Sequence, residues 1–306
     1  MASISFPKIV AIIGTNASGK SSVGLELAKR FNGEIISADS RQIYKNFDLC
    51  SGKVTAEERK QVVHHLIDIC KIGDSFSVAE FQNRTYNTIA GVLERGKLPF
   101  IVGGTGLYIN SVVYGYVLYS EHPNDDLRMV LESKTLEELL DMLPLDAKSR
   151  LKENPSDYAN KRRIIRLIEK IESGDSLEKK CEPRYSALQI GVTWPKDILY
   201  ERIDERLTLR IRQGMIDEVQ GYLDEGGNPD HLYGLGLDYR YILWYLTGKY
   251  SSLDEFCNEL SKAIKKFAKR QLTWFKRYKS IRWLNMMDND YIEQATELIE
   301  RFLNEK

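Results

Sequence analysis

The stretch Lys8-Ile-Val-Ala-Ile-Ile-Gly-Thr-Asn-Ala-Ser-Gly-Lys-Ser21 decides the fold. Its five apolar residues, Ile9 to Ile13, run without a polar break, which is typical of a strand buried on both faces of a parallel sheet. The pattern Gly14-x-x-x-x-Gly19-Lys20-Ser21 comes directly after it, and apolar residues at helical spacing follow from Val23 to Phe31. Strand, glycine-rich loop and helix are the context in which this pattern binds phosphate. The sequence therefore predicts an α/β protein with a P-loop NTPase-like parallel sheet flanked by helices.

The chemistry predicted for this loop is anion binding. Its glycines let backbone N–H groups turn toward phosphate oxygens, Lys20 adds a positive charge, and the helix start adds the positive end of its dipole. Ser21 is the candidate Mg²⁺ ligand. A glycine turn that carries Lys-Ser by chance is the structural alternative, and the pattern does not identify the phosphate compound. The predicted diphosphate- or nucleotide-binding residues are Gly14, Thr15, Asn16, Ala17, Ser18, Gly19, Lys20 and Ser21.

The composition is that of an ordinary soluble protein, because 42% of the 306 residues are hydrophobic and 29% are charged. No apolar run approaches the ~18 residues of a membrane span, and the first residues lack the pattern of a signal peptide. The four cysteines are scattered, which argues against a zinc site or a disulfide framework. We therefore expect a cytoplasmic monomer that does not bind membranes.

The charge is distributed unevenly along the chain. The net charge is zero, yet residues 262–282 contain nine Lys or Arg and no Asp or Glu. Basic residues alternate there with Trp274, Phe275 and Tyr278. Basic side chains contact phosphates and aromatic rings stack on unpaired bases, so this segment is a candidate nucleic-acid surface. An amphipathic helix that buries at least half of these rings is the alternative.

Two further turns follow predicted strands at residues 33–39 and 97–103. Asp39 ends the first strand, and Gly103-Gly104-Thr105-Gly106 follows the second. Because ligands gather at the carboxyl ends of parallel strands, we expect Asp39 and Thr105 to lie near the phosphate loop. Asp39 could be a helix N-cap, a Mg²⁺ partner or a general base, and spacing alone does not decide between them.

The remaining chain predicts a mostly helical inserted subdomain and a helical C-terminal region. A polar break at 121–126 places the insertion at 121–183 and the α/β core at 1–120 and 184–306. Apolar spacing predicts helices across 127–173 and 234–283, a strand at 187–194, and a helix that starts at Pro195. On that last helix Arg202, Arg206 and Arg210 share one face, where they could cover a diphosphate, and we expect Asp204 and Glu205 to pair with part of their charge.

Four segments together resemble the tRNA dimethylallyltransferase (isopentenyl-tRNA transferase) family, and the resemblance covers about residues 8–285. The first is the loop at 14–21, which many nucleotide enzymes share. The other three, which are specific in combination, are Asp39-Ser-Arg-Gln-Ile-Tyr44, Val102-Gly-Gly-Thr-Gly-Leu-Tyr-Ile109 and Lys269-Arg-Gln-Leu-Thr-Trp274. His64-His65-Leu-Ile-Asp68 is also similar, and no C-terminal zinc finger follows, which indicates the bacterial type.

The resemblance implies an enzyme that needs Mg²⁺ and transfers a dimethylallyl group from dimethylallyl diphosphate to tRNA. The acceptor is the exocyclic N6 amine of the adenosine 3′-adjacent to the anticodon in tRNAs reading codons that start with U. The resemblance implies three catalytic residues: Asp39 as the base, Thr105 at the target nucleotide, and Arg206 on the diphosphate. The implied tRNA-binding residues are Asp39, Ser40, Arg41, Gln42, Thr105, Arg128, Arg162, Arg163, Ile164, Ile165, Arg166, Arg270, Gln271 and Trp274.

The sequence departs from the family pattern at the insertion, which is about ten residues shorter than usual, and at Gly234-Leu-Gly-Leu-Asp-Tyr-Arg240. A P-loop nucleotide kinase would use the same loop with ATP but would not need residues 262–282. An adenylate prenyltransferase acting on AMP or ADP, and a nucleic-acid-binding module with a vestigial loop, are further alternatives. The intact Lys20, Ser21 and Asp39 argue against the last of these.

Overall fold

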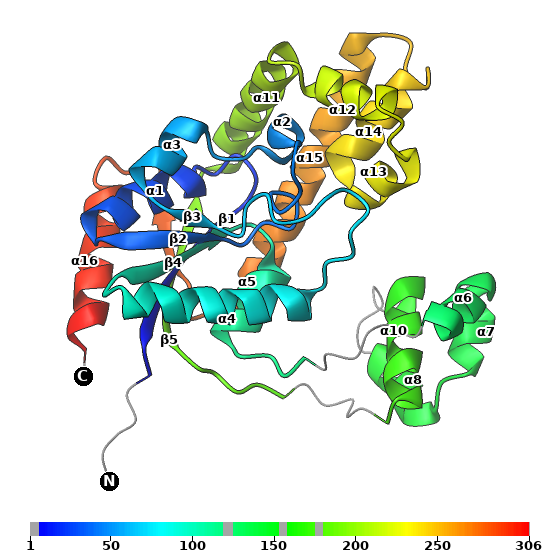
Figure 1. Cartoon of the computed structure of the whole chain (residues 1–306), viewed down its shortest axis with the longest axis horizontal. Helices are drawn as coiled ribbons and strands as arrows, with labels where there is room; N and C mark the ends of the chain where they lie inside the picture. The colour runs from blue at the N-terminus through cyan, green and yellow to red at the C-terminus, as the bar shows by residue number, and fades with distance from the viewer. Residues whose placement is uncertain (1–5, 119–124, 153–157, 175–179, 306) are drawn as a thin grey trace. The chain divides into compact units, whose positions relative to one another are not determined.

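The computed structural model describes residues 6–118, 125–152, 158–174 and 180–305. Its centre is a six-stranded sheet in the order β3-β2-β4-β1-β5-β6, in which every neighbouring pair is parallel. The strands are β1 (Lys8–Gly14), β2 (Gly33–Ser37), β3 (His64–His65), β4 (Leu98–Gly103), β5 (Ser186–Thr193) and β6 (Arg282–Asn285). Helices cover the sheet on both sides (Figure 1), which confirms the predicted P-loop NTPase-like fold class.

β1 lies in the middle of the sheet because its side chains are apolar on both faces. Ile9 to Ile13 are fully buried, and Val10 pairs in register with Phe100 on one side and Leu188 on the other. Alternate residues point to opposite faces of a strand. Accordingly Ile9, Ala11 and Ile13 pack in the cluster that includes α4 and α5, while Val10 and Ile12 pack with α1 and α16. The end of β1 is thereby fixed, and with it the phosphate loop.

The helices that accompany the sheet belong to a unit formed by residues 1–115 and 183–306. α11 to α15 build a second core around Phe47 and Cys50, beyond the carboxyl ends of the strands (Figure 1). The helices of this unit are α1 (Lys20–Arg30), α2 (Asp48–Ser51), α3 (Ala56–Gln61), α4 (Val78–Glu94), α5 (Gly106–Val113), α11 (Lys196–Arg212), α12 (Met215–Asp224), α13 (Pro229–Leu235), α14 (Leu237–Leu246), α15 (Leu253–Phe275) and α16 (Tyr291–Asn304).

Residues 116–182 form a second compact unit with a hydrophobic core of its own. Leu139 and Ile164 are fully buried in that core. The polar break expected at 121–126 falls partly on residues 121–124, which lie outside the described residues. The helices of this unit are α6 (Asp125–Ser133), α7 (Leu136–Asp141), α8 (Leu145–Lys152) and α10 (Lys161–Glu172). None of the helices in the described ranges is both long and apolar enough to span a membrane.

The expectation that residues 234–283 are helical is wrong at the end of this range. α15 stops at Phe275, and the chain returns to the sheet as β6, with Leu284 buried and Val192 of β5 as its partner in register. The sequence did not reveal this strand, because it has four residues, of which only Leu284 is buried, and such a short segment gives little periodic signal. Breaks at Gly236 and at residues 247–252 further divide the region into α13, α14 and α15.

Candidate active site

The phosphate loop turns through two left-handed residues before α1 begins at Lys20. Ala17 has φ 59° and Gly19 has φ 87°. The Lys20 ammonium group donates to the Thr15 carbonyl at 3.2 Å, and the buried Ser18 hydroxyl has no hydrogen-bond partner among the described residues. The loop is thus folded around its lysine, which a carbonyl of the loop itself holds.

A cavity of about 390 Å³, which we call the phosphate cavity, opens onto this loop. Four cationic side chains line it, and Ser21 lies on its wall. Burial lowers the pKa of Lys20 to about 8, although nearby Asp39 raises it, and Arg206 adds a smaller decrease. Glu58 and Glu205 also line the cavity, and Lys53 is paired with Asp48 and Asp68, so positive charge exceeds negative charge by a smaller margin than the number of cations suggests. An excess of positive charge suits a polyanion. The four cations are Lys20, Lys53, Arg202 and Arg206.

A second cavity of about 500 Å³, the Asp39 cavity, lies at the carboxyl ends of β2 and β4. Asp39 and Thr105 both line it, as predicted from their positions after these strands. Asp39 Oδ1 accepts the backbone N–H of Arg41 at 2.9 Å, and Thr105 Oγ1 accepts that of Ser40 at 3.1 Å. Residues 40–43 form turns rather than a helix, so Asp39 is not the N-cap of a helix. Among the hydrogen bonds of the described residues, none involves Asp39 Oδ2, so this oxygen can contact a ligand in the cavity.

The Arg206 side chain lines both the phosphate cavity and the Asp39 cavity. Its guanidinium donates to the Gly52 carbonyl at 3.2 Å, while Arg202 donates to the Ala17 carbonyl of the phosphate loop at 3.1 Å. Burial lowers the pKa of Arg206, helped by Arg210, but an arginine stays charged. The predicted pairing with Asp204 is wrong, because Asp204 pairs with Lys265 at 2.6 Å.

The glycine-rich turn after β4 packs against α15. Gln271 donates to the Gly104 carbonyl at 3.0 Å and accepts the Asn16 N–H at 2.9 Å. A Cβ on Gly106 would overlap the Trp274 ring, so the close approach requires glycine there. Gln271 and Trp274, both predicted to bind tRNA, line the Asp39 cavity, and Gln271 also supports the two loops.

Comparison with known proteins identifies the family of this chain. The family model described as IPP transferase matches residues 42–278. The chain belongs to this family. It is 43% identical to tRNA dimethylallyltransferase 1 of Geotalea daltonii over 90% of each chain, and 39% identical to the tRNA dimethylallyltransferase of Alkaliphilus oremlandii over 95% of this chain and 96% of the relative.

Solved structures agree with the family assignment. The full-length tRNA isopentenylpyrophosphate transferase of Bacillus halodurans is 36% identical, with a TM-score of 0.71 over 96% of this chain and 98% of the other. A eukaryotic dimethylallyltransferase captured while acting on tRNA has a TM-score of 0.81 over 97% of this chain and 79% of its own, at 24% identity, which supports the fold alone. The IPP transferase match begins after the phosphate loop, so the loop is an independent observation.

Residues of the smaller unit that were predicted to bind tRNA divide into two groups. Arg128 and Arg166 both pair with Glu169, at 2.7 and 3.0 Å, and Arg162 and Arg163 are exposed. Ile164 and Ile165 are 0% and 4% exposed in the core of the unit. We therefore correct the prediction for these two side chains, which hold α10 against its neighbours.

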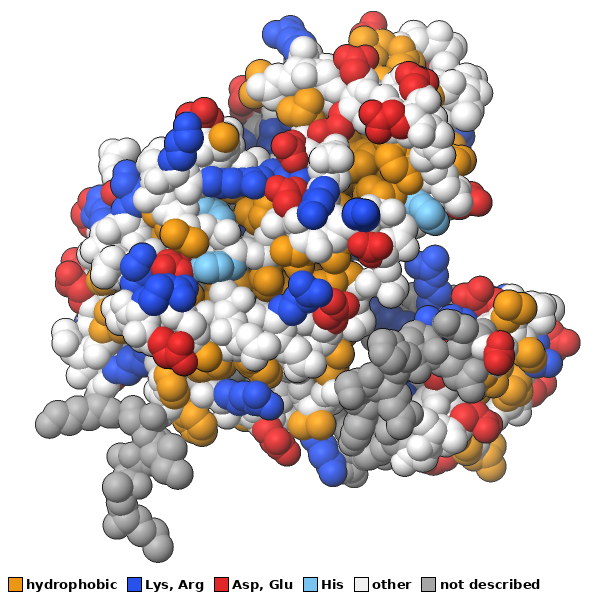
Figure 2. Space-filling view, in the orientation of Figure 1, with side chains coloured by type: hydrophobic (Ala, Val, Ile, Leu, Met, Phe, Trp, Pro, Cys, Tyr) orange, Lys and Arg blue, Asp and Glu red, His pale blue; other side chains and the backbone are white. Residues whose placement is uncertain are grey.

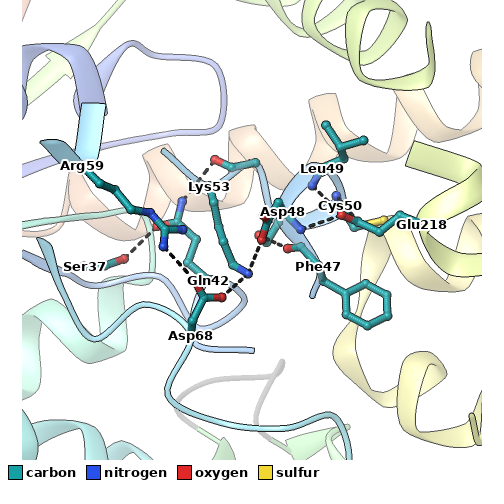
Figure 3. A network of polar contacts seen from close by, with 12 residues as sticks. Ser37, Gln42, Phe47, Asp48, Leu49, Cys50, Lys53, Arg59, Asp68 and Glu218 are labelled. Atoms are coloured by element: carbon teal, nitrogen blue, oxygen red, sulfur yellow. Dashed lines mark hydrogen bonds and ion pairs between the residues drawn. The ribbon is translucent and has the colours of Figure 1, made fainter. Parts of the chain in front are cut away.

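Sequence reasoning missed the segment 48–53 and the side chains that hold it (Figure 3). Glu218 on α12 accepts backbone N–H groups of α2, and Gln42 donates to the Gly52 carbonyl at 3.2 Å. Lys53, whose side chain is 1% exposed, pairs with Asp48 at 2.6 Å and Asp68 at 2.5 Å. No local pattern marks Glu218, because its partners are about 170 residues away in the chain.

The altered segment Gly234–Arg240 also lies at the site. Asp238, Tyr239 and Arg240 line the Asp39 cavity, and buried polar atoms of all three lack hydrogen-bond partners within the described residues. Arg270 lines the same cavity from α15 and is exposed. Figure 2 shows a band of Lys and Arg side chains on the face of the larger unit that carries α2 and α3. Asp and Glu side chains are interspersed with them on the same face.

Proposed function

We propose that the protein transfers the dimethylallyl group of dimethylallyl diphosphate to the N6 amine of an adenosine in tRNA. The target is the adenosine 3′-adjacent to the anticodon in tRNAs reading codons that start with U. One observation carries the proposal: Arg206 borders both a cationic cavity at the phosphate loop and a cavity that contains Asp39 and Thr105. A diphosphate in the first and a flipped-out base in the second would meet beside this arginine.

The reaction breaks the bond between C1 of the dimethylallyl group and the diphosphate oxygen, and the electron pair leaves with the diphosphate. The backbone N–H groups of the loop, Lys20 and Arg206 stabilise the charge that develops there. The adenine amine forms the new bond to C1 and gives up a proton. Asp39 Oδ2 would accept this proton, because Oδ1 already accepts the Arg41 N–H. Thr105 keeps the 39–41 turn in place through the Ser40 N–H.

Mg²⁺ is part of this proposal. Ser21, in the first turn of α1, lies on the wall of the phosphate cavity, which Glu58 and Glu205 also line. Hydroxyl and carboxylate oxygens beside a phosphate site fit an ion that keeps several waters and binds through one or two protein oxygens and substrate phosphates. When bound, Mg²⁺ would neutralise charge on the leaving diphosphate.

The proposal is tested by incubating the protein with unmodified tRNA, Mg²⁺ and dimethylallyl diphosphate labelled in the prenyl group. A parallel reaction contains γ-labelled ATP, and a third replaces tRNA by AMP. Label should enter tRNA only from the prenyl donor, and a tRNA with guanosine at the target position should stay unlabelled. Label from ATP would indicate a kinase, and label in AMP but not in tRNA would indicate an adenylate prenyltransferase.

A further inference from the structure

Residues 48–53, which we call the 48–53 strap, touch both cavities of the site. Cys50 and Ser51 line the Asp39 cavity, whereas Gly52 and Lys53 line the phosphate cavity. The strap consists of the single-turn helix α2 and the two residues after it. A helix this short is not stable by itself, because few of its backbone groups find partners inside it. Its position must therefore be set by other parts of the chain.

Glu218 supplies this support at the start of the strap (Figure 3). Its Oε1 accepts the N–H groups of Asp48 and Leu49 at 2.6 and 2.8 Å, and its Oε2 accepts that of Cys50 at 2.8 Å. Three hydrogen bonds to one carboxylate are charge-assisted and satisfy the N–H groups that have no partner in the first turn. Glu218 thus holds the start of α2, while Arg210 donates to the Leu49 and Cys50 carbonyls and Gln42 donates to the Gly52 carbonyl.

The end of the strap presents its carbonyl group to Arg206. Gly52 has φ 60°, and its N–H bonds the Leu49 carbonyl at 3.1 Å, which closes the turn. The Gly52 carbonyl then accepts from Arg206 at 3.2 Å, and a Cβ on Gly52 would overlap that guanidinium. Among the described residues, Arg206 forms no ion pair with a carboxylate, so this carbonyl is the group that holds it.

We propose that Glu218 is a positioning residue for Arg206. By holding the 48–53 strap, it places the Gly52 carbonyl that aims the Arg206 guanidinium at the phosphate cavity. The inference rests on the proposed function, in which Arg206 stabilises the departing diphosphate. A carboxylate with no contact to substrate would then control diphosphate affinity and turnover through one arginine.

The test uses Glu218→Gln, in which the amide nitrogen cannot accept the Cys50 N–H. We expect pyrophosphate to bind about 10-fold more weakly by calorimetry and kcat to fall 10- to 100-fold, with tRNA affinity unchanged within twofold. The matched control is Glu255→Gln, because Glu255 also accepts a backbone N–H, that of Ser251 at 2.7 Å, and lines neither cavity. If both variants bind pyrophosphate as the unchanged protein does, the inference is wrong.

A double-mutant cycle separates positioning from general loss of structure. In an Arg206→Ala background, Glu218→Gln should change pyrophosphate affinity less than twofold, because the group it acts through is gone. Independent, multiplicative losses would overturn the inference. Gly52→Ala tests the same contact from the other end without touching Glu218, and should weaken pyrophosphate binding to a similar extent. Pyrophosphate affinity is measured without tRNA, so these results stand whether or not the unchanged protein prenylates tRNA.

Discussion

The side-chain oxygen of Gln271 accepts the backbone N–H of Asn16 at 2.9 Å, across 255 residues of the chain. The nitrogen of the same amide donates to the Gly104 carbonyl at 3.0 Å, and the residue is 9% exposed. One side chain of α15 therefore joins the phosphate loop to the turn that carries Thr105. The amide thus supports the spacing between the two loops, in addition to the pairing of β1 with β4 that places Ile13 opposite Gly103.

We expect Gln271→Leu to destabilise the protein by ~1–3 kcal/mol, because a buried donor and a buried acceptor lose their partners. Turnover should fall as well, since the phosphate loop is no longer held against the Thr105 turn. Urea unfolding and steady-state kinetics measure the two effects. The control is Gln220→Leu, which removes only an exposed contact to Asp224. Equal stability of the two variants would contradict a bridging role for Gln271.

Asp39→Asn separates the shape of the 39–41 turn from its chemistry. Asparagine keeps an oxygen that can accept the Arg41 N–H, so the turn should persist, but it cannot take a proton from the adenine amine. We expect kcat to fall ~10²-fold or more, and pyrophosphate affinity to change little. Asp39→Ala should lose turnover similarly. If either Asp39 variant binds pyrophosphate poorly but keeps the normal turnover per bound complex, Asp39 is not the base.

The depressed pKa of Lys20 predicts a pH dependence for diphosphate binding. Without an anion, Lys20 is charged below its pKa of about 8 and neutral above it. A bound diphosphate favours the charged form, so the dissociation constant should rise by up to about tenfold per pH unit above pH 8. Calorimetry with pyrophosphate from pH 7 to 9.5 measures this. Lys20→Arg is the control, because its guanidinium does not titrate there and only the ligand's own ionisation remains; identical profiles for the two proteins would exclude Lys20.

The parts of the site that the sequence predicted are those whose geometry is local. The phosphate loop and Asp39 follow buried strands directly, so their place at the sheet edge follows from strand direction alone. Glu218 and the bridging role of Gln271 could not be predicted, because their partners are distant in the chain. Ile164 was predicted to bind tRNA because its position matches the family pattern. The pattern does not say whether a side chain is exposed, and the Ile164 side chain is buried.

Glu34 on β2 predicts how the fold responds to acid. Its carboxylate contacts Arg95 at 2.7 Å, His65 at 2.7 Å and Lys97 at 3.0 Å. The hydrogen bond from Arg95 is the largest of the effects that lower the pKa of Glu34 to about 2, against the opposing effect of burial. The folded-state pKa lies below the unfolded value of 4.5, so this stabilisation is full above pH 4.5 and is lost as the pH falls toward 2.

Glu34→Gln should therefore lower the free energy of unfolding at pH 7 by ~1–3 kcal/mol, and the difference from the unchanged protein should shrink at pH 3. Urea titrations at the two pH values measure it. Glu80→Gln is the control, because Glu80 makes an exposed pair with Arg84 that contributes little. A difference between Glu34→Gln and the unchanged protein that is the same at both pH values would show that packing, not charge, is responsible.

Lys269 and Arg270 lie next to each other on α15, and both are exposed. If they contact tRNA phosphates, replacing each by alanine should weaken tRNA binding and reduce the slope of log K against log salt by about 0.7–0.9 per lost contact. Binding measured from 50 to 200 mM salt gives the slope. The control is Arg301→Ala, because Arg301 is an exposed residue of α16 and lines neither cavity. The slope depends on the number of phosphates that the protein neutralises. Weaker binding with an unchanged slope would therefore mean that Lys269 and Arg270 shape the site without contacting phosphate.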